Sequence, residues 1–314
     1  MKTIKKSLLE RNTELMKNAI YTAAEFFAGG GGFGLGMIMT YFRILYAAEN
    51  FQNAIDNYRK NLGNHIHNVD IAKLNAEDVL KEMNMKVGEL DYAHYSPPCT
   101  KISRASGMPN PFDPLNGLYF RSIELIHKIQ PKVFSMETVD NITSKEFSGL
   151  LNSILYMLKK EDLYRFDYRI LNAADYNVPQ NRKRFILVGV RKDLNLPPVF
   201  PIRSDKVITV KDLCPDVEAF YSTQFSKSPY SPNRPLCTLT ASKSLKFIKN
   251  TKPVDPTIDE LVKLSTFPED YEFEGVLTNQ WKILGNSVPP NFAEAIAMTI
   301  KEQILDVYYN NSKI

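Results

Sequence analysis

Short apolar segments alternate with amphipathic segments along roughly the first 190 residues, and this alternation restricts the fold more than any other feature. The apolar segments are bounded by turn-forming or charged residues and lie at 22–28, 43–49, 90–96 and 132–139. The intervening segments have apolar residues at helical spacing and lie at 51–62, 75–83, 118–129 and 147–159. Strands separated by helices of this length predict an α/β fold with a Rossmann-like, doubly wound and mostly parallel sheet.

The composition changes at about residue 193. The following stretch holds most of the prolines, is rich in Ser, Thr and Lys, and shows no long helical period. Helical patterning resumes after Pro289 and Pro290. We therefore expect a large domain over residues 1–192, a second, smaller and irregular domain over 193–275, and a C-terminal segment, 276–314, that returns to the large domain.

Charge and composition restrict the class of protein and its partners. Residues 179–252 contain 14 Lys or Arg and 5 Asp or Glu, although the net charge of all 314 residues is only +4. Such a block is typical of a surface that binds a polyanion, or of a solvated face.

With 44% hydrophobic and 24% charged residues, the composition is that of a globular protein. The sequence has no apolar run long enough to span a membrane and no signal peptide for export. Three scattered cysteines indicate neither a disulfide framework nor a zinc site, so we expect a cytoplasmic protein without a metal.

A glycine-rich turn follows the first predicted strand. Gly29, Gly31 and Gly34 have the spacing of a nucleotide-binding turn, in which the backbone approaches a polar ligand closely. Glu49 ends the next predicted strand, where a carboxylate can accept hydrogen bonds from ribose hydroxyls, and Asp70 follows the third, where it could hold an adenine amino group. The pattern predicts a nucleoside-type cofactor; the alternative is a turn that needs its glycines only for conformation.

Two further groups follow the fourth and fifth predicted strands. Cys99 lies on a loop stiffened by Pro97 and Pro98, and Glu137 ends the fifth strand. Because consecutive parallel strands end at one edge of a sheet, we expect the thiol and the carboxyl group to be neighbours. The thiol is a candidate nucleophile and the carboxyl group a candidate proton donor, whereas Cys214 and Cys237 are read as small buried side chains.

Arg182 and Arg184 precede a later apolar strand. Their spacing places both guanidinium groups on one side of the strand, an arrangement suited to phosphate or carboxylate. The alternative is a solvated strand edge.

Taken in order, these motifs resemble those of the DNA (cytosine-5) methyltransferase family. The similarity extends from Glu25 to the C-terminal helix and rests on seven segments: FFAGGGGFGLG (26–36), SPPC (96–99), METV (136–139), DYNVPQNRKRFILVG (175–189), RPLCTLT (234–240), LVKLSTFPEDYEF (261–273) and LGNSVPP (284–290). The resemblance implies an enzyme that uses S-adenosylmethionine, holds duplex DNA between a large domain and a small target-recognition domain, and rotates a cytosine out of the helix.

The resemblance also implies residue roles. Cys99 would add to carbon 6 of the flipped cytosine, Glu137 would stabilise protonation at ring nitrogen 3, Arg184 would orient the base or its phosphate, and Arg182 would support the cysteine loop. Further matching or basic positions are expected to bind the cofactor (Phe27, Gly29, Gly31, Gly34, Glu49, Asp70, Pro98, Asn286 and Ser287) or the DNA (Ser103, Gln180, Arg234, Lys243 and Lys246).

The chain departs from the family pattern at several positions. Glu25 stands for Asp, Ser96 for Gly, Thr100 for Gln and Thr138 for the Asn of Glu-Asn-Val. Only 49 residues separate Arg184 from Arg234, which predicts a reduced recognition domain and a short or relaxed target site.

Other readings remain open at this point. A transfer RNA methyltransferase would carry out the same reaction on cytosine in RNA. A catalytically inactive relative would bind DNA without methylating it. A nicotinamide dehydrogenase would explain the glycine turn but not the Pro-Pro-Cys segment. The favoured reading predicts a monomer acting on double-stranded DNA in a prokaryotic cell or encoded by a phage, with a restriction endonuclease as a further partner in a modification system.

Overall fold

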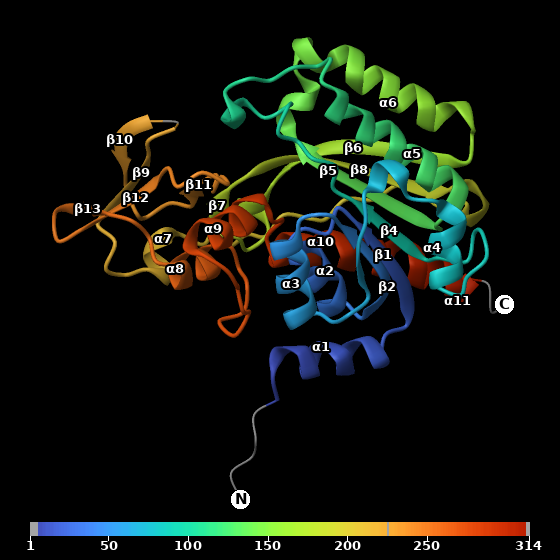
Figure 1. Ribbon diagram of the computed structural model, residues 1–314, viewed down its shortest axis with the longest axis horizontal. Helices are drawn as coiled ribbons and strands as arrows, with labels where there is room; N and C mark the ends of the chain where they lie inside the picture. The colour runs from blue at the N-terminus through green and yellow to red at the C-terminus, as the bar shows by residue number, and fades with distance from the viewer. Residues whose placement is uncertain (1–5, 225, 312–314) are drawn as a thin grey trace, which may run out of the picture.

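A seven-stranded sheet forms the centre of the larger part of the molecule (Figure 1). In the computed structural model the described residues are 6–224 and 226–311. The strand order is β3-β2-β1-β4-β5-β8-β6, with bounds β1 Tyr21–Phe26, β2 Phe42–Glu49, β3 Ile66–Asn68, β4 Tyr92–Tyr95, β5 Val133–Val139, β6 Tyr164–Asn172 and β8 Lys183–Arg191. All neighbours from β3 to β5 pair in parallel, which confirms the expected α/β sheet.

One strand of this sheet runs against the others. β8 is antiparallel to both β5 and β6. The chain between β6 and β8, all of it described, contains no crossover helix, and a parallel neighbour would need such a connection. The chain therefore reverses direction and inserts β8 between two strands that run the opposite way.

Helices cover both faces of the sheet. One face packs against α1 (Leu8–Lys17), α2 (Gly32–Met39), α3 (Gln52–Asn61) and α10 (Pro290–Ile300), and the other against α4 (Ala76–Glu82), α5 (Gly117–Ile129) and α6 (Ser148–Lys160). These layers give two apolar cores, one on each side of the sheet. The central strands are therefore buried on both faces, and the polar residues at their ends are brought together at one edge, whereas the outer strand β6 is largely exposed.

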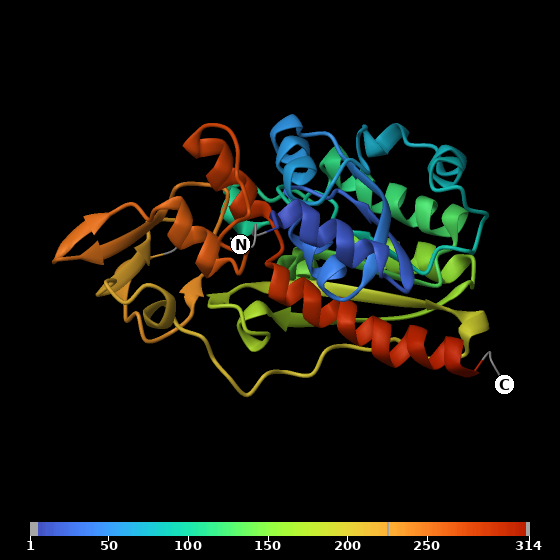
Figure 2. The same ribbon diagram turned by 90° about the horizontal axis from the view of Figure 1, so that it is seen from below.

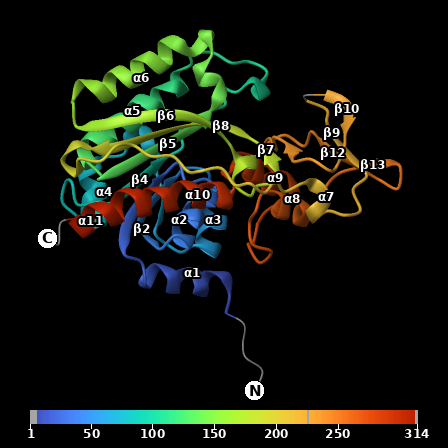
Figure 3. The ribbon, with the colours of Figure 1, turned by 180° about the vertical axis from the view of Figure 1, so that it is seen from behind.

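The C-terminal segment lies along the large sheet. α10 begins at Pro290, continues through a π-helical turn (Lys301–Leu305) into α11 (Asp306–Asn311), and packs on α2 (Figures 2 and 3). Tyr309 at its end donates a hydrogen bond of 2.6 Å to Asp91. Throughout residues 6–224 and 226–311, no helix combines the length and apolar character needed to cross a bilayer.

A second sheet lies to one side of the first (Figure 1). It is antiparallel, with the order β10-β9-β12-β13 and bounds β9 Ala219–Ser222, β10 Ser226–Tyr230, β12 Leu245–Lys249 and β13 Lys252–Val254. The short helices α7 (Val210–Leu213) and α8 (Ile258–Leu264) and the longer α9 (Leu277–Asn286) pack nearby. A two-stranded ladder between β7 (Gln180–Asn181) and β11 (Leu236–Cys237) joins this smaller part to the larger one.

Candidate active site

One cavity of about 1210 Å³ lies between the large sheet and the smaller part. Its lining includes the glycine turn after β1, the loops after β2, β4 and β5, the start of β8, the end of α9, and residues 237–242 of the smaller part. The cavity therefore lies at the carboxyl ends of the parallel strands, the usual ligand site of such sheets. Cys99 and the glycine turn, 70 residues apart in the chain, line the same space.

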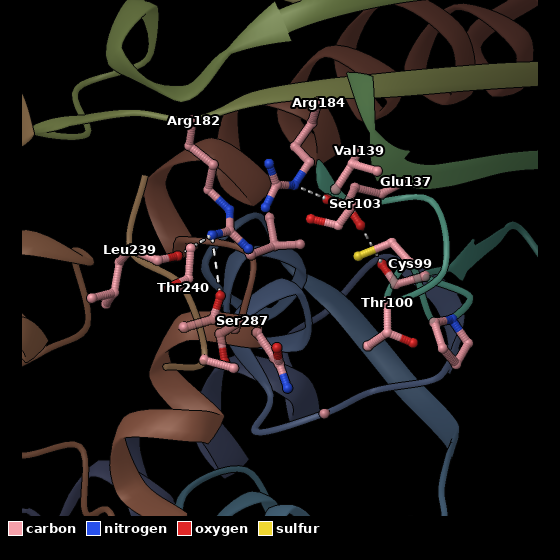
Figure 4. A pocket seen from close by; sticks show the side chains of 18 of the residues that line it. Cys99, Thr100, Ser103, Glu137, Val139, Arg182, Arg184, Leu239, Thr240 and Ser287 are labelled. Carbon is pink, nitrogen blue, oxygen red and sulfur yellow. Dashed lines mark hydrogen bonds and ion pairs between the residues drawn. The ribbon is translucent and has the colours of Figure 1, made fainter. Parts of the chain in front are cut away.

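The Cys99 loop follows β4 directly. Its backbone folds into a turn in which the amides of Ile102 and Ser103 donate to the Cys99 carbonyl at 3.0 and 2.8 Å. Pro97 and Pro98, which precede the cysteine, restrict the backbone that leads from the strand to the thiol. The thiol is half-buried and lines the cavity (Figure 4).

Glu137 and Arg184 meet across adjacent strands. Arg184 Nε lies 2.7 Å from Glu137 Oε1, and both side chains are almost fully buried. Ser96 Oγ donates to the other carboxyl oxygen of Glu137 at 3.4 Å. The antiparallel insertion of β8 next to β5 creates this contact, because it places the arginine beside the end of β5.

The two arginines beside Cys99 offset part of the effect of burial, and the pKa of the thiol stays raised. Burial raises the pKa of the Cys99 thiol, Arg184 and Arg182 act to lower that pKa, and Glu137 acts to raise it. Figure 4 shows the cysteine, Glu137 and both arginines around one space. Cys237 also lines the cavity, but burial raises its pKa to about 11. Of the two cavity thiols, Cys99 is the one beside two guanidinium groups.

Arg182 has a different set of partners from those expected. Its Nη1 donates to the carbonyl oxygens of Leu239 at 3.0 Å and Gly285 at 3.2 Å, rather than to the cysteine loop. Burial lowers the pKa of Arg182 to about 9, so the group stays charged at neutral pH. The arginine thus ties the smaller part and the end of α9 to the strand that carries Arg184.

The glycine-turn half of the cavity carries two carboxylates. Glu49 accepts the Gly29 amide at 2.8 Å and the amides of Asn50 and Phe51 at 2.9 Å each. Asp70 accepts the Ala72 amide at 3.0 Å and also lines the cavity. Gly29 has a φ of +53°, a conformation that glycine adopts without strain. The remaining expected cofactor positions found in the lining are Phe27, Pro98, Asn286 and Ser287.

Several predicted site residues lie elsewhere among the described residues. Gly31 and Gly34 pack inward: a Cβ on Gly34 would lie 2.4 Å from Glu25 Oε2, and one on Gly31 would lie 2.7 Å from Leu62 Cδ1. They shape the turn and do not line the cavity.

Among the expected DNA-binding residues, Ser103 and Arg234 line the cavity. Gln180 is buried and accepts the Leu239 amide at 3.1 Å, so it anchors the smaller part. Lys246 pairs with Asp255 at 2.6 Å, and Lys243 lies over the Trp281 ring; neither is in the lining.

The lining also contains residues that the sequence did not single out. They include Gly30, Gly32, Asn50, Phe51, Asn141, Thr240 and Lys282. Asn50 and Phe51 directly follow Glu49, so adjacency to a predicted strand end could have indicated them. Thr240 and Lys282 come from remote segments, and no local pattern indicates their place.

Comparison with known proteins gives a consistent family. The model of the family described as C-5 cytosine-specific DNA methylase matches residues 21–253 and 222–302. The Type II methyltransferase M.MthTI of Methanothermobacter thermautotrophicus is 28% identical, over 90% of this chain and 97% of its own. M.Sau96I of Staphylococcus aureus is 27% identical, over 92% of this chain and 77% of its own.

Solved structures agree with the fold. A putative DNA modification methyltransferase encoded within an E. coli prophage superposes with a TM-score of 0.71 at 21% identity, covering 91% of this chain and 99% of that one. The methyltransferase EhMeth of Entamoeba histolytica gives a TM-score of 0.67 at 15% identity, covering 91% and 98%.

Proposed function

The chain belongs to the C-5 cytosine-specific DNA methylases and is a DNA (cytosine-5) methyltransferase, and from that premise we propose that Cys99, Glu137 and Arg184 carry its chemistry. One observation carries the proposal: the thiol, the Glu137–Arg184 pair and the glycine turn line a single cavity. A methyl donor and a target base must be in contact for methyl transfer, and a shared cavity is the arrangement that allows it.

We further propose S-adenosylmethionine as the methyl donor, held in the glycine-turn half. The lining there fits a nucleoside: Glu49 and Asp70 offer carboxylate oxygens for hydroxyl and amino groups, and Phe27 offers an aromatic face. Gly29, Asn286 and Ser287 complete this half of the cavity. When bound, S-adenosylmethionine supplies an electrophilic methyl group.

The residues of the chain then have distinct tasks. Carbon 5 of cytosine is a poor nucleophile, so Cys99 gives up its proton and adds as the thiolate to carbon 6, and Glu137 passes a proton to ring nitrogen 3 and stabilises it there. The ring becomes an enamine whose carbon 5 can take up the methyl group. Loss of the carbon 5 proton to water, return of the nitrogen 3 proton to Glu137 and expulsion of the Cys99 thiolate restore the aromatic ring. Arg184 holds the Glu137 carboxyl group and favours the thiolate, since its guanidinium lies beside both.

The smaller part is proposed as the target-recognition domain, within the boundaries 193–275. Arg234, Thr240 and Ser242 of this part line the same cavity as Cys99, which an extruded base would enter from the duplex. Its main sheet has four short strands, which offer few side chains for reading base edges. A short or relaxed target site follows, and methylation confined to sites of six or more specified base pairs would contradict it.

The proposed cellular setting is a modification system in the cytoplasm of a prokaryotic or phage-infected cell. The relatives named above are Type II methyltransferases, and a restriction endonuclease of the same specificity is the partner such a system uses. A monomer suffices because one chain supplies all sides of the cavity. Elution as a dimer in size-exclusion chromatography would contradict the monomer.

Bisulfite sequencing of DNA from cells that express the protein tests the proposed function. We expect 5-methylcytosine with the natural chain and none with Cys99→Ala. Cys237→Ala is the matched control, because it removes the other thiol that lines the cavity, and it should leave methylation undiminished. Wild-type methylation by Cys99→Ala would overturn the assigned nucleophile. Separate digests of DNA and RNA check the substrate, since 5-methylcytosine confined to transfer RNA would favour the RNA alternative.

A further inference from the structure

A buried chain of hydrogen-bonding side chains leads to Glu137 from inside the sheet. Tyr92, His94 and Ser96 alternate along β4 and its extension, and Ser135 and Glu137 alternate along β5. Alternate residues of a strand face the same side, and His94 is the register partner of Ser135. The two sets of side chains therefore interleave on one face of the sheet.

The contacts form a continuous series. Tyr92 OH lies 2.6 Å from Ser135 Oγ, which lies 2.7 Å from His94 Nδ1. His94 Nε2 lies 2.8 Å from Ser96 Oγ, and Ser96 Oγ lies 3.4 Å from Glu137 Oε2. The Phe33 ring stacks on the imidazole with 3.3 Å between centroids, which holds the His94 ring in its plane.

The hydrogen bonds have one consistent direction. Burial holds the pKa of His94 well below its usual range, so the ring is neutral and has a single N–H. Since Ser96 donates to Glu137, its oxygen is free to accept the Nε2–H of His94. Nδ1 then accepts from Ser135, and Ser135 accepts from the Tyr92 phenol. This tautomer follows from the network, and every donor in the series points toward the carboxylate.

Two of the departures from the family pattern, Thr138 and Ser96, lie next to Glu137, the first in sequence and the second in space. Thr138 stands where the family has Asn, and its hydroxyl is paired with Tyr119 OH at 2.6 Å on the opposite face of β5 from Glu137. Ser96 stands where the family has Gly, and its hydroxyl faces Glu137. A hydroxyl group is thus added beside the carboxyl group in a chain that lacks the usual amide.

We propose that Ser96, held in place by His94, is a positioning residue that orients the Glu137 carboxyl group. Arg184 fixes one carboxyl oxygen and Ser96 the other, so the plane of the carboxyl group is defined from two sides. The inference rests on the proposed role of Glu137 and assigns no chemical step to Ser96 or His94.

Steady-state kinetics on duplex DNA, with single-turnover measurements of the chemical step, test the inference. Ser96→Ala removes the hydroxyl, and we expect it to lower kcat about tenfold, the effect of one hydrogen bond to a charged group, with the KM for DNA and S-adenosylmethionine unchanged within about twofold. Ser96→Thr keeps a hydroxyl and should recover most of the rate. Ser122→Ala, which removes a buried serine hydroxyl bonded to Leu118 O on α5, should match the natural chain.

A second variant tests the link through the imidazole. His94→Phe should slow the reaction about as much as Ser96→Ala, and the double variant should be no slower than either, because one break already interrupts the series. Wild-type kcat for Ser96→Ala, or equal loss for Ser96→Ala and Ser96→Thr, would overturn the inference. Glu137→Ala distinguishes failure of the proposed function from failure of this inference. If Glu137→Ala is fully active, the proposed role of Glu137 is wrong. If Glu137→Ala is impaired but the Ser96 and His94 variants are not, only the positioning role of Ser96 is wrong.

Discussion

Arg184 and Glu137 face each other from antiparallel strands, with Nε and Oε1 2.7 Å apart and each side chain only 9% exposed. A buried pair of this kind has lost the hydration of two charges, and each charge compensates the other. The same pair lies beside the Cys99 thiol. It therefore links β5 to β8 and also influences the pKa of the thiol.

Removing one partner of this pair should destabilise the protein. Arg184→Met leaves the Glu137 carboxylate buried without its cation, and we expect the free energy of unfolding to fall by about 3–5 kcal/mol in urea titrations. Adding Glu137→Gln to Arg184→Met should recover part of that loss. Lys192→Met, which breaks the exposed pair with Asp162, should change stability by at most about 0.5 kcal/mol. Equal stabilities for Arg184→Met and the natural chain would contradict the role of burial.

The protonation of Glu25 should make stability depend on pH. Burial raises the pKa of Glu25 to about 8, above its ordinary value of 4.5. Between these values the folded protein keeps the proton and the unfolded chain has lost it, so unfolding becomes easier as pH rises from about 4.5 to about 8. Glu25→Gln stays neutral and should flatten this dependence, gaining stability on the order of 4 kcal/mol relative to the natural chain by pH 8–9. Parallel pH profiles of the two proteins in chemical denaturation would contradict the assignment.

Two glycine-to-alanine substitutions should have opposite effects. A Cβ on Gly32, at the start of α2, would lie 2.1 Å from the Val288 carbonyl oxygen, so backbone must move. We expect Gly32→Ala to cost about 1–3 kcal/mol and to weaken binding of S-adenosylmethionine, measured by calorimetry. A Cβ on Gly149, in α6, would meet no atom of the described residues within 4 Å, and Gly149→Ala should stabilise by about 0.5–1 kcal/mol. A neutral Gly32→Ala would indicate that this close approach relaxes easily.

The basic residues of the smaller part should differ in their effect on DNA binding. Arg234 lines the cavity and has its guanidinium over the Tyr230 ring, so Arg234→Ala should weaken duplex binding and reduce the salt slope by about 1. Lys246→Ala should matter less, because Asp255 already neutralises that lysine. Fluorescence anisotropy over a series of NaCl concentrations gives both slopes. The reverse order of the two variants would place the DNA on the Lys246 side.

Local patterns explain why much of the architecture could be predicted. The strand at residues 133–139 and the helix at 117–129 differ from the expected ranges by one residue at one end, since apolar periodicity reports burial directly. Glu49, Asp70, Cys99 and Glu137 could be placed at one rim because parallel strands end together.

Other features depended on packing between distant segments. Gly31 and Gly34 matched a nucleotide-binding spacing, yet neighbours from other elements decide that they pack inward. The partners of Arg182 lie 57 and 103 residues away, so no local pattern could assign them. The spacing Tyr92-x-His94-x-Ser96 was visible in the chain, but its meaning required the register between β4 and β5.

The amino-acid order by itself determined the alternation of strands and helices, the turn after the first strand, and the chemical groups available at each strand end, because these depend on neighbours within a few residues. Tertiary structure alone decided that β8 runs antiparallel beside β5, so that Arg184 reaches Glu137, and that Ser96 rather than Thr138 faces that carboxyl group. Strand order and register arise from the burial of two sheet faces at once, a property of the whole fold rather than of any segment.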